Sequence, residues 1–136
     1  SYCFEAIEQA PDRVVAAVLQ NPIGLWDNRD TWDAAVQGYS ETVRARDPSI
    51  PEATIKSFGQ NMFGGDFVFS VTRDFVRNCP TPLLLQPGTD KPHPAHTSDE
   101  IAALAPNIKV QTDWRGPEFL QESITHVRDF LEKHTR

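Results

Sequence analysis

Short runs of uninterrupted apolar residues most constrain what this chain can fold into. Residues 14–19 (VVAAVL) have no polar face and are followed by Asn21-Pro22, and residues 82–86 (PLLLQ) repeat the pattern. A strand of this kind is typical of a parallel sheet that is covered on both faces. Residues 109–113 (KVQTD) follow as a third strand. Because helical patterns separate these strands, the sequence predicts an α/β fold with about three parallel strands and flanking helices.

Helical periodicity fills the intervals between these strands. A first helix opens the chain and stops at Pro11. The spacing of Thr97 and Glu100 is that of a capping box, which predicts a helix before the third strand. A closing helix begins at Gly116-Pro117. Its apolar positions at helical spacing are Leu120, Ile124, Val127 and Leu131.

Residues 26–80 differ from the rest of the chain, because they hold most of the phenylalanines and all but one of the tryptophans. We predict three helices here. The first spans residues 29–46, and the second follows the capping-box spacing of Ser49 and Glu52. Gly64-Gly65 end the second, and Asp66 caps a third helix that runs to about residue 78, although FVFSV inside it also fits a strand.

Charge and composition narrow the class of protein. The chain has 136 residues, enough for one domain, and a formal net charge of −6, which argues against nucleic acid or an anionic membrane as a partner. No run approaches the roughly 20 apolar residues of a membrane helix, and the first residues do not resemble a signal peptide. Cys3 and Cys79 lie far apart and are expected to be reduced thiols in a cytoplasmic protein.

The order of these segments resembles the second half of an α/β-hydrolase. Residues 10–14 (APDRV) and the strand after them look like the phrase that follows the nucleophile helix in that family. A helical cap insertion comes next, matching residues 26–80, and then a strand that ends in a Gly-x-Asp turn, matching Leu83 to Asp90. The resemblance covers essentially the whole chain, residues 1–136, as a single hydrolase-like segment.

Two family residues are missing at their expected places. By this alignment the nucleophile lies before Ser1, and Ser1 itself falls past the sharp turn that would carry it. The family's histidine belongs in the loop after the last strand, and residues 114–119 (WRGPEF) contain none.

Asp90 and His93 are the candidate catalytic residues. The resemblance implies that Asp90 is the carboxylate that orients a catalytic histidine, and His93 is then a surrogate base. Asp90 could instead brace a turn, and His93 could be an ordinary loop histidine. The spacing of Asp90, His93, His96 and Asp99 also allows a metal site, but prolines interrupt the segment and we expect neither a metal nor a cofactor.

The aromatic residues of the cap are the candidate substrate-binding residues. In the resembling family such a cap covers an apolar pocket, whereas aromatic residues of helices otherwise belong to the core. The candidates are Trp26, Trp32, Met62, Phe63 and Phe67.

The sequence therefore carries two hypotheses about function. In the first, the chain is the C-terminal part of an α/β-hydrolase-like enzyme for a small, largely apolar ester, amide or C–C substrate, inactive on its own. In the second, it is a non-catalytic binding or regulatory module with the same fold. In both, residues 14–19 form an apolar strand with an open edge. We therefore expect a homo-oligomer, or a complex with the N-terminal half of the parent chain.

Overall fold

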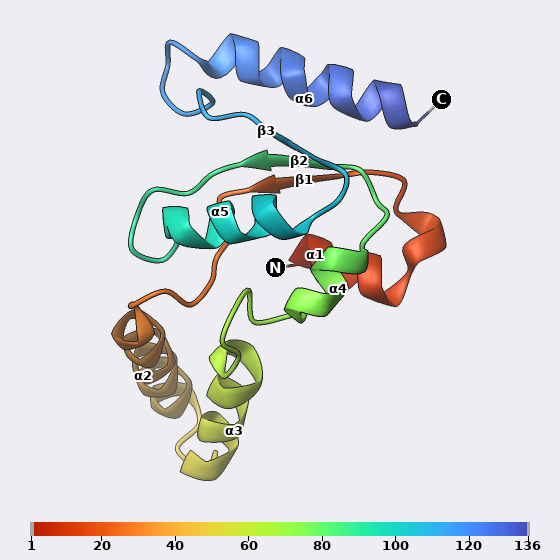
Figure 1. Cartoon of the computed structure of the whole chain (residues 1–136). Coiled ribbons are helices and arrows are strands. Elements are labelled where there is room, and N and C mark those ends of the chain that lie inside the picture. The colour runs from red at the N-terminus through yellow and green to blue at the C-terminus, as the bar shows by residue number, and fades with distance from the viewer. Residues whose placement is uncertain (1, 136) are drawn as a thin grey trace.

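A computed structural model describes residues 2–135 as a parallel sheet with helices on both faces. The strands are β1 (Ala17–Gln20), β2 (Leu83–Gln86) and β3 (Ile108–Val110), and β2 lies in the middle (Figure 1). Ala17 pairs with Leu83, and Leu83 pairs with Ile108. The expected α/β class with three parallel strands is confirmed.

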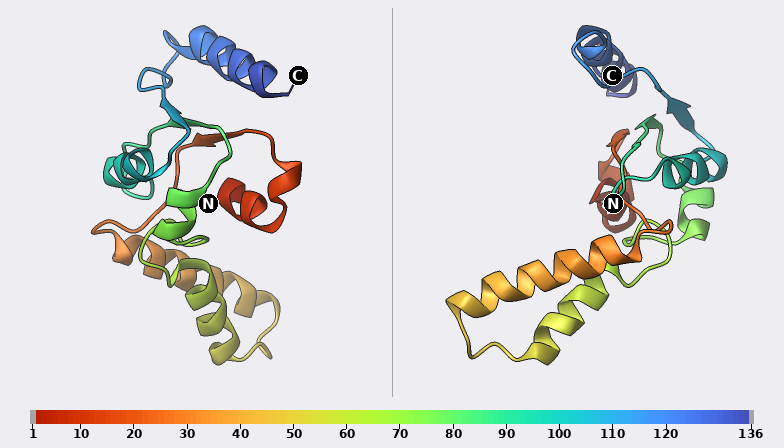
Figure 2. Two further views of the ribbon diagram at one scale, coloured as in Figure 1. Left: turned by 45° about the vertical axis from the view of Figure 1, so that its right-hand side comes forward. Right: turned by 90° about the vertical axis from the view of Figure 1, so that its left-hand side faces the viewer.

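The two faces of the sheet are covered unequally. Helices α1 (Tyr2–Gln9), α4 (Arg73–Asn78) and α5 (Ala95–Leu104) lie on one face, and α6 (Leu120–His134) lies alone on the other (Figures 1 and 2). A short 3-10 helix, η1 (Pro11–Arg13), joins α1 to β1. Within residues 2–135, no helix has the length and apolar composition needed to cross a membrane.

The hydrophobic core lies between the sheet and the first group of helices. Alternate strand residues point into it, because successive side chains of a strand face opposite sides. Its main members are Phe4, Ile7, Ala17, Leu19, Val68, Val76, Leu83, Leu85 and Ile101.

Helix α6 departs from the expected packing. Leu120, Ile124 and Leu131 were expected to stack against the sheet, but they are 57%, 41% and 36% exposed. The buried residues of α6 are Ser123 and Phe130 instead. The helix meets the sheet along a different stripe, and no other segment of residues 2–135 covers its apolar face (Figure 2).

Helices α2 (Arg29–Arg46) and α3 (Glu52–Phe63) form a hairpin that projects away from the sheet (Figure 2). The backbone leaves and returns at one point, where the Leu25 amide donates to the Phe67 carbonyl at 2.8 Å. The two helices pack closely where Gly59 faces Val36. We call this excursion the helical hairpin.

The expected third helix of this region is wrong at its start. Helix α4 begins at Arg73, where the Thr72 hydroxyl accepts from the Phe75 amide, and not at Asp66. The segment before it is irregular because Phe67, Val68 and Val71 are all buried, which one face of a helix cannot achieve, and Phe69 has φ +67°. Neither the helix nor the strand expected over FVFSV forms.

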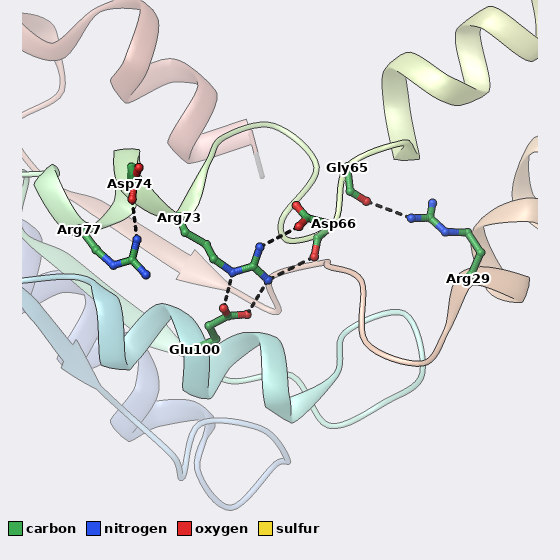
Figure 3. A network of polar contacts seen from close by, with 7 residues as sticks. All are labelled: Arg29, Gly65, Asp66, Arg73, Asp74, Arg77 and Glu100. Carbon is green, nitrogen blue, oxygen red and sulfur yellow. Dashed lines mark hydrogen bonds and ion pairs between the residues drawn. The ribbon is translucent and has the colours of Figure 1, made fainter.

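Side-chain contacts fix this irregular segment in place (Figure 3). Arg73 donates to Glu100 at 2.5 Å and to Asp66 at 3.1 Å, which joins α4 to α5. Arg29, at the start of α2, donates to the carbonyl of Gly65 at 3.0 Å. These contacts use Asp66 as an ion-pair partner rather than as a helix cap.

Both expected capping boxes are also wrong. Ser49 donates to Asp47 at 2.6 Å instead of capping α3, whose N-cap is Pro51. Helix α5 begins at Ala95, so Thr97 lies inside it and is buried.

The strands are also displaced from their expected bounds. β1 covers residues 17–20 rather than 14–19, because only these residues lie opposite β2, and Val15 is 53% exposed. β3 ends at Val110, short of the expected residue 113.

Candidate functional site

Segments that follow all three strands meet at the carboxyl edge of the sheet. Asn21 follows β1, the turn to Asp90 follows β2, and the loop with Trp114 and Arg115 follows β3. Sites in parallel sheets form at this edge, because the loops that leave neighbouring strands converge there. It is therefore the first place to look for chemistry.

The structure brings the two candidate catalytic residues into contact. Asp90 Oδ1 lies 2.5 Å from His93 Nδ1, and the same oxygen accepts the backbone amide of His93 at 3.0 Å. The carboxylate thus orients the imidazole and also braces the turn, so the two roles considered for it coexist. His93 Nε2 has no hydrogen-bond partner among residues 2–135. This is the carboxylate–imidazole arrangement in which Nε2 is left available to accept a proton.

Hydrogen bonding to the imidazole lowers the pKa of Asp90 below its ordinary value. Partial desolvation opposes this shift, while the His93 amide and the Arg115 guanidinium add to it. Asp90 is therefore ionised at neutral pH, which is the form that can hold the imidazole.

Arg115 occupies the loop in which the family resemblance places a histidine. Its Nη1 lies 3.7 Å from Asp90 Oδ2, and its Nη2 donates to the side chain of Asn21. Trp114 lies beside it, with the guanidinium 4.9 Å from the ring centroid, and donates from Nε1 to the Pro87 carbonyl at 3.0 Å. Arg115 therefore ties the three loops together, but a guanidinium cannot serve as a base at neutral pH.

Beneath the site lies a chain of buried amides that the sequence analysis missed. Gln20 donates to Gln86 at 2.8 Å, and Gln86 donates to Gln111 at 3.0 Å and to Ser123 at 2.8 Å. A signal was present, because each of the three apolar strands is closed by a glutamine, in AVLQ, LLLQ and IKVQ. We call these residues the glutamine chain.

The candidate substrate-binding residues do not form one pocket. Met62 and Phe63 line a cavity of about 280 Å³ beside Tyr2 and Phe69. Phe63 also stacks on the buried Trp32, with ring centroids 4.8 Å apart.

The other two candidates lie apart from this pair. Trp26 is 53% exposed and stacks on His96 with ring centroids 3.4 Å apart, close in sequence to His93. Phe67 is buried in the core beneath the guanidinium of Arg73.

The structure also bears on a metal and on a nucleophile. Within residues 2–135, no three histidine, cysteine, aspartate or glutamate side chains gather as a metal site would require. In the same part of the chain, no serine, threonine or cysteine side chain hydrogen-bonds to His93. Ser1 lies outside the described residues.

Comparisons with known proteins add no identification. No protein-family model matches the chain. No curated protein matches it. No solved structure matches it.

Proposed function

We propose that this chain is the C-terminal part of an α/β-hydrolase-like enzyme and is inactive on its own. Its substrate is a small, largely apolar ester, amide or C–C compound. The observation that carries the proposal is the 2.5 Å contact between Asp90 Oδ1 and His93 Nδ1 at the carboxyl edge of the sheet. In the proposed enzyme, Asp90 orients His93, and His93 accepts the proton of a nucleophile that another part of the enzyme supplies.

The first test is turnover by the chain alone. Acyl transfer requires an activated nucleophile beside the base, and none contacts His93 within residues 2–135. We expect hydrolysis of 4-nitrophenyl acetate and butyrate to match that of a heat-denatured sample. Turnover that is well above this background and is lost in a single-residue variant would contradict the inactive state.

The second test measures the imidazole directly. Asp90 accepts the proton on Nδ1, which leaves the lone pair on Nε2 free to react with diethylpyrocarbonate. We expect Asp90→Asn to slow acylation of His93 several-fold, followed by mass spectrometry of the peptide. Asp99→Asn is the matched control, because Asp99 is exposed and lies on the same segment. An unchanged rate at His93 in folded Asp90→Asn would show that the carboxylate only braces the turn.

In a longer chain that also carries a nucleophile, the effect is larger. Asn in place of Asp90 favours the wrong tautomer of the imidazole, and in well-studied triads this change reduces kcat by up to about 10⁴. A loss below about tenfold in a folded variant would mean that Asp90 has a structural role only.

The alternative is a non-catalytic binding module. The observation that favours it is Arg115, which stands in the loop after β3 and contacts Asp90 at 3.7 Å where the resemblance requires a histidine. A buffered ion pair with Arg115, rather than a base, is then the purpose of Asp90. Acylation of His93 would in that case depend on neither Asp90 nor Arg115, so the same experiment separates the two functions.

A further inference from the structure

The outer edge of β1 is open. The Ala17 amide donates to the Pro82 carbonyl and the Asn21 amide donates to the Gln86 carbonyl, both at 3.0 Å, so the odd-numbered residues face β2. Strand geometry then directs the amides and carbonyls of Val18 and Gln20 away from the sheet. Of these groups, the Val18 carbonyl receives a weak contact from the Cys3 thiol at 3.6 Å.

Nothing in the strand protects this edge. Natural edge strands carry charges, prolines or bulges that prevent pairing with other chains. Residues 14–20 contain no charged residue and no proline. The edge is therefore suited to receive another strand.

A groove of about 650 Å³ lies directly beside this edge. Gln20 of β1 forms one side, and α6 forms the other with Leu120, Ile124 and Leu131. These are the apolar residues of α6 that are 57%, 41% and 36% exposed. A strand added to β1 would place alternate side chains under this apolar face, so one occupant would meet both requirements.

We infer that the occupant is a second copy of this chain, with the two β1 strands paired antiparallel about a two-fold axis. With the axis at Leu19, Val18 of one copy lies opposite Gln20 of the other. The outward amides and carbonyls of these two residues then bond to each other, as in any hydrogen-bonded antiparallel pair.

The strand is its own complement for two reasons. Because residues 14–20 are uncharged, self-pairing brings no like charges together. A two-fold axis perpendicular to the sheet also keeps both α6 helices on the same face. The two sheets become one continuous sheet, and the groove beside each β1 is filled by the strand and the α6 of the other copy.

The first test is the mass of the purified chain in solution. Light scattering at tens of micromolar should give twice 15.3 kDa. Val18→Lys and Ile124→Lys should each give the monomer mass, because they place a charge at the new strand pair and in the groove. Val110→Lys is the matched control, since Val110 is 48% exposed on the opposite edge strand, and it should remain dimeric.

The second test is amide hydrogen exchange, which needs no substitution. The amides of Val18 and Gln20 should be protected at high concentration and should lose at least tenfold in protection on dilution to the monomer. The Leu19 amide, which faces β2, should be protected at both concentrations.

Three results would overturn this inference. One is a clean monomer at tens of micromolar, with or without a different polypeptide bound at the edge. Another is a dimer that survives Ile124→Lys, and the third is a dimer in which the Val18 and Gln20 amides exchange freely. The exchange experiment retains its force if Val18→Lys fails to fold.

Discussion

Gln86 shows how much of the site depends on one residue. It is fully buried at the end of the central strand, and its side-chain amide joins Gln20, Gln111 and Ser123. A buried amide is tolerated only when its donors and acceptors are satisfied. The glutamine chain therefore stabilises the carboxyl edge on which Asp90 and Arg115 are mounted.

Gln86→Leu should be clearly destabilising. It removes the partner of Gln111 and Ser123 inside the protein, and leaving a buried polar group unpaired costs roughly 1 to 3 kcal/mol. Urea unfolding measures this loss. Gln121→Leu, at an exposed position of α6, should change the free energy of unfolding by no more than about 0.5 kcal/mol. Equal effects of the two substitutions would show that the glutamine chain contributes nothing.

Asp90 should make stability depend on pH. Its pKa is lowered in the folded chain, chiefly by the hydrogen bond to His93, so the ionised form favours folding. This stabilisation is present above the unfolded pKa of about 3.9 and is lost as the pH falls through the lower folded pKa.

We therefore expect wild type to exceed Asp90→Asn in urea midpoint at neutral pH, and the difference to fade below about pH 4. Asp99→Asn supplies the same change in charge on the same segment. A difference between wild type and Asp90→Asn that grows as the pH falls would refute the sign of the shift.

The sequence located Asp90 because the turn after an apolar strand fixes which residue stands at the sheet edge. It could not show that Arg115 approaches Asp90, since that contact joins loops from different strands. It also could not divide the aromatic residues of the cap, because helical spacing does not distinguish Trp32, which is buried, from Trp26, which is exposed.

Among the elements, α2 and α3 match their expected bounds most closely, since a proline precedes α3 and glycines follow it. The failures have physical causes. Residues 66–72 are shaped by contacts with other elements, in particular the bonds from Arg73 to Asp66 and Glu100. Helix α6 shows that an apolar stripe predicts a helix but not what the stripe packs against.

Two glycines of the helical hairpin should respond to alanine in opposite directions. A Cβ on Gly38 meets nothing within 4 Å, so Gly38→Ala should stabilise α2 by up to about 1 kcal/mol. A Cβ on Gly59 would lie 2.7 Å from Val36 Cγ1, so overpacking of roughly 1 to 3 kcal/mol should cancel or exceed the same gain.

Thermal unfolding of both variants measures the difference. Gly59→Ala that stabilises the chain as much as Gly38→Ala would show that α2 and α3 do not pack closely there.

At the scale of the whole molecule, the helical hairpin and the core are separate structures. No residue between 26 and 66 belongs to the main core cluster of the described residues. The sequence predicted this division from composition, and it predicted the parallel sheet from the apolar runs. The open face of α6 depends on what lies beside it and could not be predicted.

Replacing residues 29–65 with a short Gly-Ser linker should leave a folded sheet. The hydrogen bond from the Leu25 amide to the Phe67 carbonyl already holds the two ends of this segment together. We expect less helical circular dichroism but a cooperative thermal transition. A control that replaces only residues 48–51 at the tip should unfold near wild type. Loss of cooperativity in the larger deletion alone would mean that the helical hairpin is needed to fold the core.

The closed base of the helical hairpin also has a consequence for how the chain folds. Gln20 and Gln86 are 66 positions apart, and the entropy lost in closing such a loop grows with the logarithm of its length. A helical hairpin made of local contacts forms early and joins Leu25 to Phe67, which leaves a much shorter stretch of free chain to close. The helical hairpin then acts as a kinetic shortcut for pairing β1 with β2. A refolding rate unchanged by the 29–65 replacement and by Gly59→Ala alike would contradict that role.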